Sequence, residues 1–481
     1  TMNKTIQFLI FLCILTTSCF AQTGITWNAT TDIISASGNN HPRIAIDRSG
    51  NPLLLWNNTT DAMFARWDGA AFTTPISINP NNIDVAGAAW MGPDIVSFGD
   101  TVYIVFKQSP ESIDTCHIFC VHSYDGGVTF STPVQVDAIA DSLSRFPVVT
   151  TDDSGNPIIG FMKFNASYLD SRWVVARSSD FGFSFSVDTK ASGWSSGTSV
   201  ICDCCPGAIA CSGNNVAVVY RDNNSNIRDM WAGISTDGGN SFSFGMPIDQ
   251  HNWSVFVCPS TGGDAEIIDD TLYSVFMNGN GGTNLCYMNT SSISEMAGSQ
   301  GIELTDAIPG LTFQSYPRLA SDGTAMAVTW KQNVNGNDQC LIRFTNDISN
   351  GLPMAYDTVD LNHIVNADVA VYNGTVYVAW QDDSSLTIKL RTGAFNSTTS
   401  IRDNMSTHNF SVYPNPTSSE VLIMNENPMD EIKITNLLGQ EVYESKPMLK
   451  KVSLQLEKSG IYFVNVTSDN HKFTKLLSVV K

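Results

Sequence analysis

Four cysteines and one histidine form the most reactive group of side chains that the sequence predicts. Cys202, Cys204 and Cys205 are close neighbours in the chain, and His251 and Cys258 follow later. Because disulfides persist in the oxidising compartments outside the cytoplasm, an exported chain would join some of these cysteines. We expect a disulfide between Cys205 and Cys258, or between either of them and Cys202 or Cys204. The alternative is a copper or zinc site, since thiolate and imidazole are ligands that these ions prefer.

Seven basic residues recur at two positions of a repeated strand pattern, and an eighth lies in a nearby loop, where together they could hold an anion. Residues 22–407 contain only 17 lysines and arginines, and residues 408–481 hold eight lysines against eight acidic residues, so the net charge of −20 lies before the tail. A cluster of cations on one face of such a body would bind carboxylate, sulfate or phosphate, with arginine giving bidentate contacts. Some of these cations could instead be paired internally. The eight are Arg43, Arg145 and Arg318 at strand openings, Lys107, Lys163, Arg221 and Lys331 just after second strands, and Arg228 in the loop that Arg221 begins.

The elements that must position these side chains form a repeat between residues 40 and 400. Each copy has an opening that often contains proline, an alternating strand, a Gly or Asn turn, and a second strand that ends in an aromatic residue. The second strands end at Trp56, Phe106, Phe161, Tyr220, Phe276, Trp330 and Trp380. No long amphipathic helix is predicted. Seven repeats of this size indicate an all-β propeller over residues 22–396, with seven blades favoured and six as the alternative.

Three copies of the repeat carry the octapeptide S-x-D-x-G-x-x-F, at residues 123–130, 178–185 and 235–242, with starts 55 and 57 residues apart. Its Ser and Asp can bond the turn backbone, and its Gly supplies positive φ. These octapeptides are Asp boxes, and over residues 25–400 the chain resembles the sialidase (BNR-repeat) superfamily. The resemblance implies that the boxes lie between third and fourth strands, on the face opposite the active site.

The same resemblance implies a set of catalytic residues. Sialidases hold the substrate carboxylate with three arginines and use an Asp acid/base and a Tyr nucleophile assisted by Glu. Arg43-Ile44 is similar to the first arginine motif, although Ala45 replaces its proline, and Arg318 with Arg221 or Arg228 would complete the triad. Asp61 is the candidate acid/base and Tyr316 the candidate nucleophile. No Glu lies in a recognisable motif, and ordinary sialidases lack the cysteine cluster, so the chain is expected to be a divergent member.

Both ends of the chain carry export signals. Lys4, an apolar run at residues 8–15 and Ala21 indicate a signal peptide over residues 1–21, with acylation of Cys19 as the alternative. The run is too short to span a membrane, and no transmembrane segment is predicted. Residues 410–481 resemble the type A sorting domain of the type IX secretion system, on the motifs at 413–416, 432–440, 459–464 and 475–481. By pattern this tail is a small β-sandwich, joined by a linker at 397–409.

The sequence therefore predicts a protein that transits the periplasm and is secreted or held at the outer cell surface, with the secretion translocon as a partner. The predicted cluster of basic residues would form a mouth on the axis of the propeller. The expected ligand of this axial mouth is an anionic glycan or a small acidic molecule. The alternatives are an exo-sialidase-type hydrolase and a metal-dependent enzyme that uses the cysteine cluster, and calcium in acidic loops is a further candidate cofactor. The acidic body excludes nucleic acid as a partner.

Overall fold

The computed structural model describes residues 23–481 apart from 113–115, 138–141, 196–199, 297–298, 362, 397–409, 414, 416, 437–439, 469–470 and 481. Two compact units lie within residues 1–398 and 399–481. The predicted signal peptide (1–21) and linker (397–409) lie outside the described residues. Among the residues that are described, no helix has the length and apolar character needed to cross a membrane.

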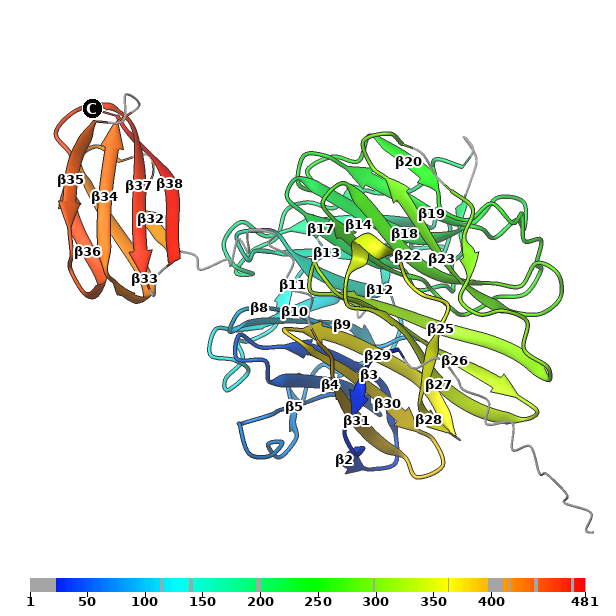
Figure 1. Ribbon diagram of the computed structural model, residues 1–481. Coiled ribbons are helices and arrows are strands. Elements are labelled where there is room, and N and C mark those ends of the chain that lie inside the picture. The colour runs from blue at the N-terminus through cyan, green and yellow to red at the C-terminus, as the bar shows by residue number, and fades with distance from the viewer. Residues whose placement is uncertain are drawn as a thin grey trace, which may run out of the picture. The chain divides into compact units, whose positions relative to one another are not determined.

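In the described residues, the first unit has seven antiparallel sheets arranged around an axis (Figure 1). This confirms the predicted propeller and the predicted seven blades. The strands of blades one to three are β3 (Asn39–Ile46), β4 (Pro52–Asn58), β5 (Asp61–Arg66), β6 (Ile76–Ser77); β7 (Asp84–Val85), β8 (Asp94–Phe98), β9 (Thr101–Ser109), β10 (Ile118–Ser123), β11 (Val134–Gln135); and β12 (Ser142–Thr151), β13 (Pro157–Asn165), β14 (Arg172–Arg177), β15 (Thr189–Lys190).

Blades four to six follow the same order, with a short 3-10 helix, η1 (Ile348–Asn350), in the sixth. Their strands are β16 (Val200–Ile201), β17 (Ala208–Ser212), β18 (Asn215–Asn223), β19 (Met230–Ser235), β20 (Phe244–Pro247); β21 (Asp264–Ile268), β22 (Thr271–Asn278), β23 (Leu285–Ser292), β24 (Ile302–Glu303); and β25 (Leu311–Ser321), β26 (Met326–Val334), β27 (Asn337–Thr345), β28 (Tyr356–Leu361).

The seventh blade closes the ring by combining strands from both ends of the propeller. Its inner strands are β29 (Ile364–Tyr372), β30 (Thr375–Asp382) and β31 (Thr387–Ala394), and its outer strands are β1 (Thr26–Trp27) and β2 (Thr31–Ser35). Both outer strands pair antiparallel with β31, and Thr26 lies opposite Ala394. The indole of Trp27 also donates to Asp357 of the sixth blade at 2.9 Å. The first strands in the chain are therefore held by the last blade.

Large aromatic side chains at the ends of the second strands fill the space between neighbouring sheets. Trp56, Trp330 and Trp380 are each at most 1% exposed, and the equivalent Phe106, Phe161, Tyr220 and Phe276 are completely buried. Side chains alternate between the two faces of a strand, and both faces of a propeller sheet pack on another sheet. A large aromatic residue at the same place in every repeat therefore gives each interface the same bulky contact.

Each of the three octapeptides forms the same hydrogen-bonded turn between the third and fourth strands of its blade. In the first, Ser123 Oγ accepts from Gly127 N at 2.9 Å, and Asp125 Oδ1 accepts from Val128 N and Thr129 N at 3.0 and 2.9 Å. Gly126 and Gly127 have φ values of 69° and 80°, which favour glycine. Because neighbouring strands alternate in direction, these turns lie on the face opposite the openings of the inner strands.

The second unit is a small β-sandwich, as predicted for the tail. One sheet has the order β32–β33–β36 and the other β35–β34–β37–β38. The buried side chains of both sheets form one apolar core that includes Val421, Ile434 and Val464. The strands are β32 (Ser411–Tyr413), β33 (Glu420–Met429), β34 (Glu431–Asn436), β35 (Glu441–Ser445), β36 (Leu449–Gln455), β37 (Gly460–Ser468) and β38 (His471–Val479).

Candidate functional site

Within the described residues, four inner strands contain a bulge where the chain enters the axial region: β3, β12, β25 and β29. Three of these bulges include a residue with positive φ. His41, Phe146 and Tyr316 each have φ of 53°, and each precedes a proline. Strand pairing skips two residues at each of these places. A residue other than glycine rarely adopts positive φ, and a residue before proline normally stays extended, so this geometry is strained and must be held by its surroundings. Strained backbone of this kind concentrates at binding and catalytic sites.

These three residues line one small cavity on the propeller axis. Its volume is about 60 Å³. One water occupies about 30 Å³ in the liquid, so the cavity has room for about two waters. A carboxylate or sulfate group could therefore enter, while the rest of a sugar would have to lie outside. The other lining residues include Arg43, Trp90, Asp94, Pro206, Gly207, Thr261, Gly262, Arg318 and Asn366.

Arg318 is a cation of the cavity whose positive charge is already balanced by carboxylates. Its Nε lies 2.8 Å from Asp368 Oδ1 and 3.3 Å from Asp264 Oδ2. Burial opposes its charge, but Asp264 and Asp368 outweigh that cost, and the pKa of Arg318 is raised. Burial raises the pKa of Asp264 to about 6, so this carboxylate is mostly ionised at neutral pH. Arg318 is thus part of a fixed ion-pair network.

Arg43 lies in the same cavity and is much less well compensated. Its nearest carboxylate atom in an ion pair is Asp94 Oδ1, 3.7 Å from Nε, and its Nη1 donates to the carbonyl of Pro42 at 2.8 Å. Burial and the positive charge of Arg318 lower the pKa of Arg43 to about 10. An anion placed against this guanidinium would relieve an unfavourable electrostatic environment.

Two polar side chains beside Arg43 have buried atoms with no hydrogen-bond partner. They are Nδ1 of His41 and Oδ1 of Asn366, both in the cavity lining. Burial and the charges of Arg43 and Arg318 lower the pKa of His41, so its ring is neutral near pH 7 and can donate one hydrogen bond. The Nδ2 of Asn366 is held by the carbonyl of Ala89. Unpaired buried polar atoms are costly unless a ligand or water bonds them.

The two candidate catalytic residues lie in different places. Tyr316 lines the cavity, and burial raises the pKa of its hydroxyl. Asp61 begins β5 of the first blade, accepts a hydrogen bond from Ser77 Oγ at 2.9 Å, and is not among the cavity residues. Glu266 lies on the same side of β21 as Asp264, and burial raises its pKa to about 8. Within the described part of the chain, no hydrogen bond joins Tyr316 to Glu266.

Four of the predicted ligand-binding cations are paired with acidic residues. Glu111 binds both Lys107, at 3.0 Å, and Arg145. Lys163 lies 2.6 Å from Asp188, with both side chains buried, and Lys331 lies 2.7 Å from Asp338. The eight cations therefore do not form the continuous basic mouth that we expected. An acidic body supplies a carboxylate to most buried or half-buried cations, because an unpaired buried charge is expensive.

Arg221 and Arg228 belong to the fourth blade and are absent from the cavity lining. Arg221 is completely buried, and its two Nη atoms donate to the carbonyls of Arg228 and Met277 at 2.7 and 2.6 Å. Its guanidinium also lies 5.2 Å from the centre of the Trp253 ring. Arg228 donates to the carbonyl of Val255 and, through Nη1, to the sulfur of Cys202 at 3.1 Å. The two arginines thus face the cysteine cluster.

The cysteine cluster contains one disulfide and two thiols. Cys204 and Cys258 are bonded, with their Cα atoms 6.3 Å apart, and Cys202 and Cys205 are free. This disulfide is one of the pairings that we expected. The four sulfur atoms all lie within 4.8 Å of one another. The repeat pattern predicts equivalent strand openings for Cys205 and Cys258, and this is wrong, because the inner strands of the two blades begin at Ala208 and at Asp264.

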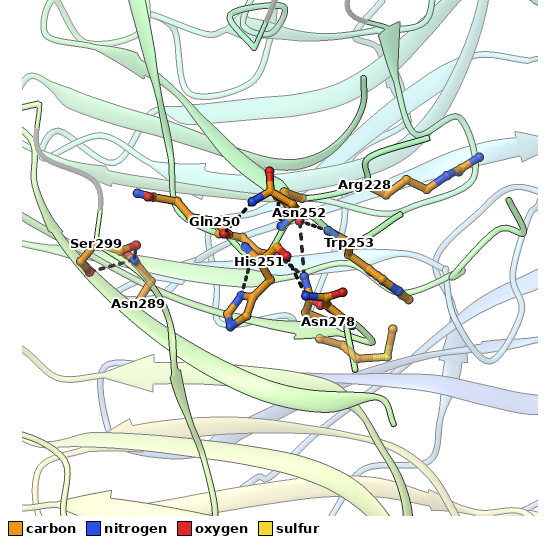
Figure 2. A network of polar contacts seen from close by, with 12 residues as sticks. Arg228, Gln250, His251, Asn252, Trp253, Asn278, Asn289 and Ser299 are labelled. Carbon is orange, nitrogen blue, oxygen red and sulfur yellow. Dashed lines mark hydrogen bonds and ion pairs between the residues drawn. The ribbon is translucent and has the colours of Figure 1, made fainter. Parts of the chain in front are cut away.

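His251 belongs to a polar network that also includes Asn252, Trp253 and Asn278 (Figure 2). Its Nδ1 lies 2.6 Å from Asp249 Oδ1, and its ring centre is 4.4 Å from that of Tyr287. Asn278 donates to the second oxygen of Asp249 at 2.7 Å. His251 is not part of the group of sulfur atoms that could share a metal. A mixed thiolate and imidazole site therefore does not fit, and a copper or zinc site of four thiolates would require the disulfide to be reduced.

The residues of the candidate site that sequence reasoning missed are His41 and Asn366, which line the cavity, and Asp264, which contacts Arg318. His41 had a usable signal, since it stands before a proline at a strand opening, as do Phe146 and Tyr316. Asp264 follows Thr261-Gly262-Gly263, where the fifth repeat has no proline to mark its opening. Asn366 lies in a repeat whose opening also lacks proline.

Comparison with known proteins identifies the tail and the fold. Residues 411–480 match the family model described as a secretion system C-terminal sorting domain. The chain is therefore that of a secreted or cell-surface protein of the Bacteroidetes type, and the tail implies an interaction with the secretion system. No curated protein is significantly similar to the chain in sequence.

Solved structures resemble the propeller at low sequence identity. An ulvan lyase of polysaccharide lyase family 25, bound to -[GlcA(1-4)Rha3S]-, has a TM-score of 0.51 and 12% identity, over 75% of this chain and 95% of the lyase. A Dyadobacter fermentans protein of unknown function has a TM-score of 0.46 and 12% identity, over 78% and 100% of the two chains. The endosialidase of phage phi92 has a TM-score of 0.44 and 9% identity, over 88% and 75%. At these identities the likeness concerns the fold.

Proposed function

We propose that this exported propeller binds an acidic glycan through one anionic group, which enters the axial cavity and contacts Arg43. The observation that carries the proposal is the state of the Arg43 guanidinium. The Arg43 side chain is only 11% exposed, its closest carboxylate partner is 3.7 Å away, and its pKa is lowered to about 10. Asp94 is a distant partner, and a carboxylate or sulfate would supply a closer countercharge and accept bidentate hydrogen bonds from Arg43.

His41 and Tyr316 would complete the contacts to the anion. Nδ1 of His41 has no partner, and in the tautomer that carries the proton on this atom the neutral ring would donate to the anion. Tyr316 lines the same wall. Arg318 adds positive potential, although Asp264 and Asp368 already hold it in place. The small cavity favours recognition of a single charged group, with the sugar rings lying across the mouth. The ulvan lyase similar in fold is bound to a glycan with both uronate and sulfate groups.

Binding is favoured over sialidase-type hydrolysis. Hydrolysis by that route needs a tyrosine activated by a neighbouring glutamate, together with an acid/base at the same cavity. In the residues that the structure describes, Tyr316 has no hydrogen bond to a carboxylate, and Asp61 is held by Ser77 away from the cavity lining. Sialic acid release that is abolished by Tyr316→Phe would reverse this preference.

Titration calorimetry on the mature chain tests the proposal. The probes are glucuronic acid, N-acetylneuraminic acid and glucose 6-sulfate, with glucose as the uncharged control. We expect at least one anionic sugar to bind, Arg43→Ala to weaken its binding at least tenfold, and added salt to weaken it further. Arg48→Ala removes an arginine that is about half exposed, 3.8 Å from Asp100, and should leave binding unchanged. Equal binding of glucose and glucuronic acid, or no effect of Arg43→Ala, would contradict the proposal.

A further inference from the structure

We propose that Cys202, Cys204, Cys205 and Cys258 form a thiol–disulfide exchange relay, in which the disulfide moves from Cys204–Cys258 to Cys202–Cys205. The inference does not depend on the proposed glycan binding. It rests on the positions of the four sulfur atoms and of the groups that contact them.

The first step is an attack by the buried thiolate of Cys202 on the neighbouring disulfide. The sulfur of Cys202 lies 3.6 Å from that of Cys204, which is within reach of the bonded sulfur that a thiolate must approach. A Cys202–Cys204 bond forms, the Cys204–Cys258 bond breaks, and Cys258 leaves as a thiolate. Ser260 Oγ donates to the sulfur of Cys258 at 3.4 Å and would stabilise the leaving group.

The surroundings of Cys202 favour the thiolate that this step requires. Arg228 Nη1 donates to its sulfur at 3.1 Å, and the sulfur of Cys205 lies within 4.8 Å of it. The pKa of Cys202 is lowered to about 6, and the largest effect in this direction is a hydrogen bond from the thiol of Cys205. The charges of Arg221 and Arg228 and the amide of Cys204 also lower this pKa, whereas burial of the thiol raises it. A thiolate of this pKa is populated at neutral pH, where an ordinary thiol remains protonated.

The second step completes the transfer without an external oxidant or reductant. Cys205 gives its proton to the Cys258 thiolate and attacks Cys202, so that a Cys202–Cys205 bond forms, the Cys202–Cys204 bond breaks, and Cys204 is released as a thiolate. The spacing of Cys202 and Cys205 is that of a Cys-x-x-Cys pair, which commonly forms a disulfide. One disulfide and two thiols are present before and after the exchange, so atoms and electrons balance.

The exchange would alter the wall of the axial cavity. The Cys204–Cys258 bond ties the loop that opens the fourth blade to the loop that opens the fifth. Pro206 and Gly207 follow the first of these cysteines, Thr261 and Gly262 follow the second, and all four line the cavity. The two loops are in close contact, since a Cβ on Gly262 would lie 2.4 Å from the carbonyl of Pro206. Transfer of the disulfide to Cys202 and Cys205 would remove the covalent link between these two loops.

Alkylation of the native full chain by N-ethylmaleimide, followed by peptide mapping without reductant, tests the relay. Cys258 is exposed, whereas Cys202 and Cys205 are buried, so the exchanged form should be trapped at Cys258. We expect labelled Cys258 to accumulate together with an equal amount of Cys202–Cys205 disulfide in the unmodified protein. The Cys202→Ser variant should label Cys258 at least tenfold more slowly.

Cys211→Ser is the matched control, because Cys211 is a free thiol of the same blade outside the sulfur cluster. Its Cys258 labelling should equal that of the unmodified protein. The relay is refuted if Cys258 stays unlabelled in the unmodified protein, or if it is labelled without a new bond between Cys202 and Cys205. Four free thiols with one bound zinc per chain, measured by elemental analysis, would also refute it and indicate a metal site instead.

Discussion

The carboxylate of Asp368 lies 2.8 Å from Nε of Arg318 and so ties the seventh blade to the sixth at the axis. Its other oxygen accepts a hydrogen bond from the amide of Ile44 in the first blade, at 3.0 Å. Asp94 and Asp264 make the same kind of hydrogen bond to the next blade. Asp94 accepts from the amide of Val149 at 3.0 Å, and Asp264 accepts from the amide of Leu319 at 2.9 Å. The inner aspartates thus join neighbouring blades as well as compensate the arginines.

Replacement of Asp368 should destabilise the propeller strongly. Asp368→Ala removes the bond to Ile44 and leaves Arg318 with only part of its compensation, and breaking a buried ion pair costs about 3–5 kcal/mol. We expect a loss of that size in the free energy of unfolding, measured by urea denaturation of the propeller. The exposed pair of Arg48 and Asp100 provides the control, since Asp100→Ala should cost less than about 1 kcal/mol. Equal losses for the two variants would show that the axial network contributes little.

Stability should fall as the pH rises through the range set by Glu266. Burial, with a smaller effect of Asp264, raises the pKa of Glu266 to about 8 in the folded state, while the unfolded carboxyl titrates near its ordinary value of about 4.3. Between these values the folded state holds a proton that the unfolded state has lost, so the free energy of unfolding decreases with pH and levels off above pH 8. The Glu266→Gln variant keeps the shape of the side chain but has no carboxyl group to titrate.

The measurement is the urea midpoint of the two proteins between pH 5 and 9. Glu266 keeps some contact with water, so we expect a difference of a few kcal/mol at most across this range. The variant should gain stability relative to the unmodified protein as the pH rises. Parallel curves for the two proteins would mean that Glu266 is already ionised in the folded state at pH 5.

The octapeptide turns should contribute separately to stability. Asp125→Ala removes acceptors for Val128 N and Thr129 N and for the hydroxyl of Thr129, so we expect a loss of about 1–2 kcal/mol. Asp180→Ala and Asp237→Ala remove matching acceptors and should behave alike. Because the turns belong to different blades, the losses should add in the triple variant. Asp84→Ala, at an exposed site in β7, is the control. If the turn variants lose no more free energy of unfolding than this control does, the turns are not stabilising.

Removal of residues 408–481 should leave the propeller intact but prevent its delivery. The two units have separate apolar cores, and the sorting domain match falls entirely within the tail. The truncated chain should therefore melt at the temperature of the propeller in the full chain, and cell fractionation should recover it from the periplasm. Recovery of the truncated protein at the cell surface would show that export does not need the tail.

Much of the architecture was predictable because the signals are local. A few neighbouring residues are enough to predict each alternating strand and each turn. These are the strands that end at Trp56, Trp330 and Trp380 and the turns around Asp125, Asp180 and Asp237. The number of repeats then predicts the number of blades. The proline openings also placed Arg43, Tyr316 and Arg318 near the axis. The tail motifs predicted the sorting domain for the same reason.

The chemistry of the site depended on contacts between blades, which no local pattern records. The sequence by itself determined that Arg43 and Arg318 stand at strand openings and that cysteines gather near residues 202–205. Only the tertiary structure decided that Arg318 is held by Asp264 and Asp368 while Arg43 is not, and that Cys204, rather than Cys205, is bonded to Cys258. The physical reason is that charge compensation and disulfide pairing act over a few ångströms between residues far apart in the chain.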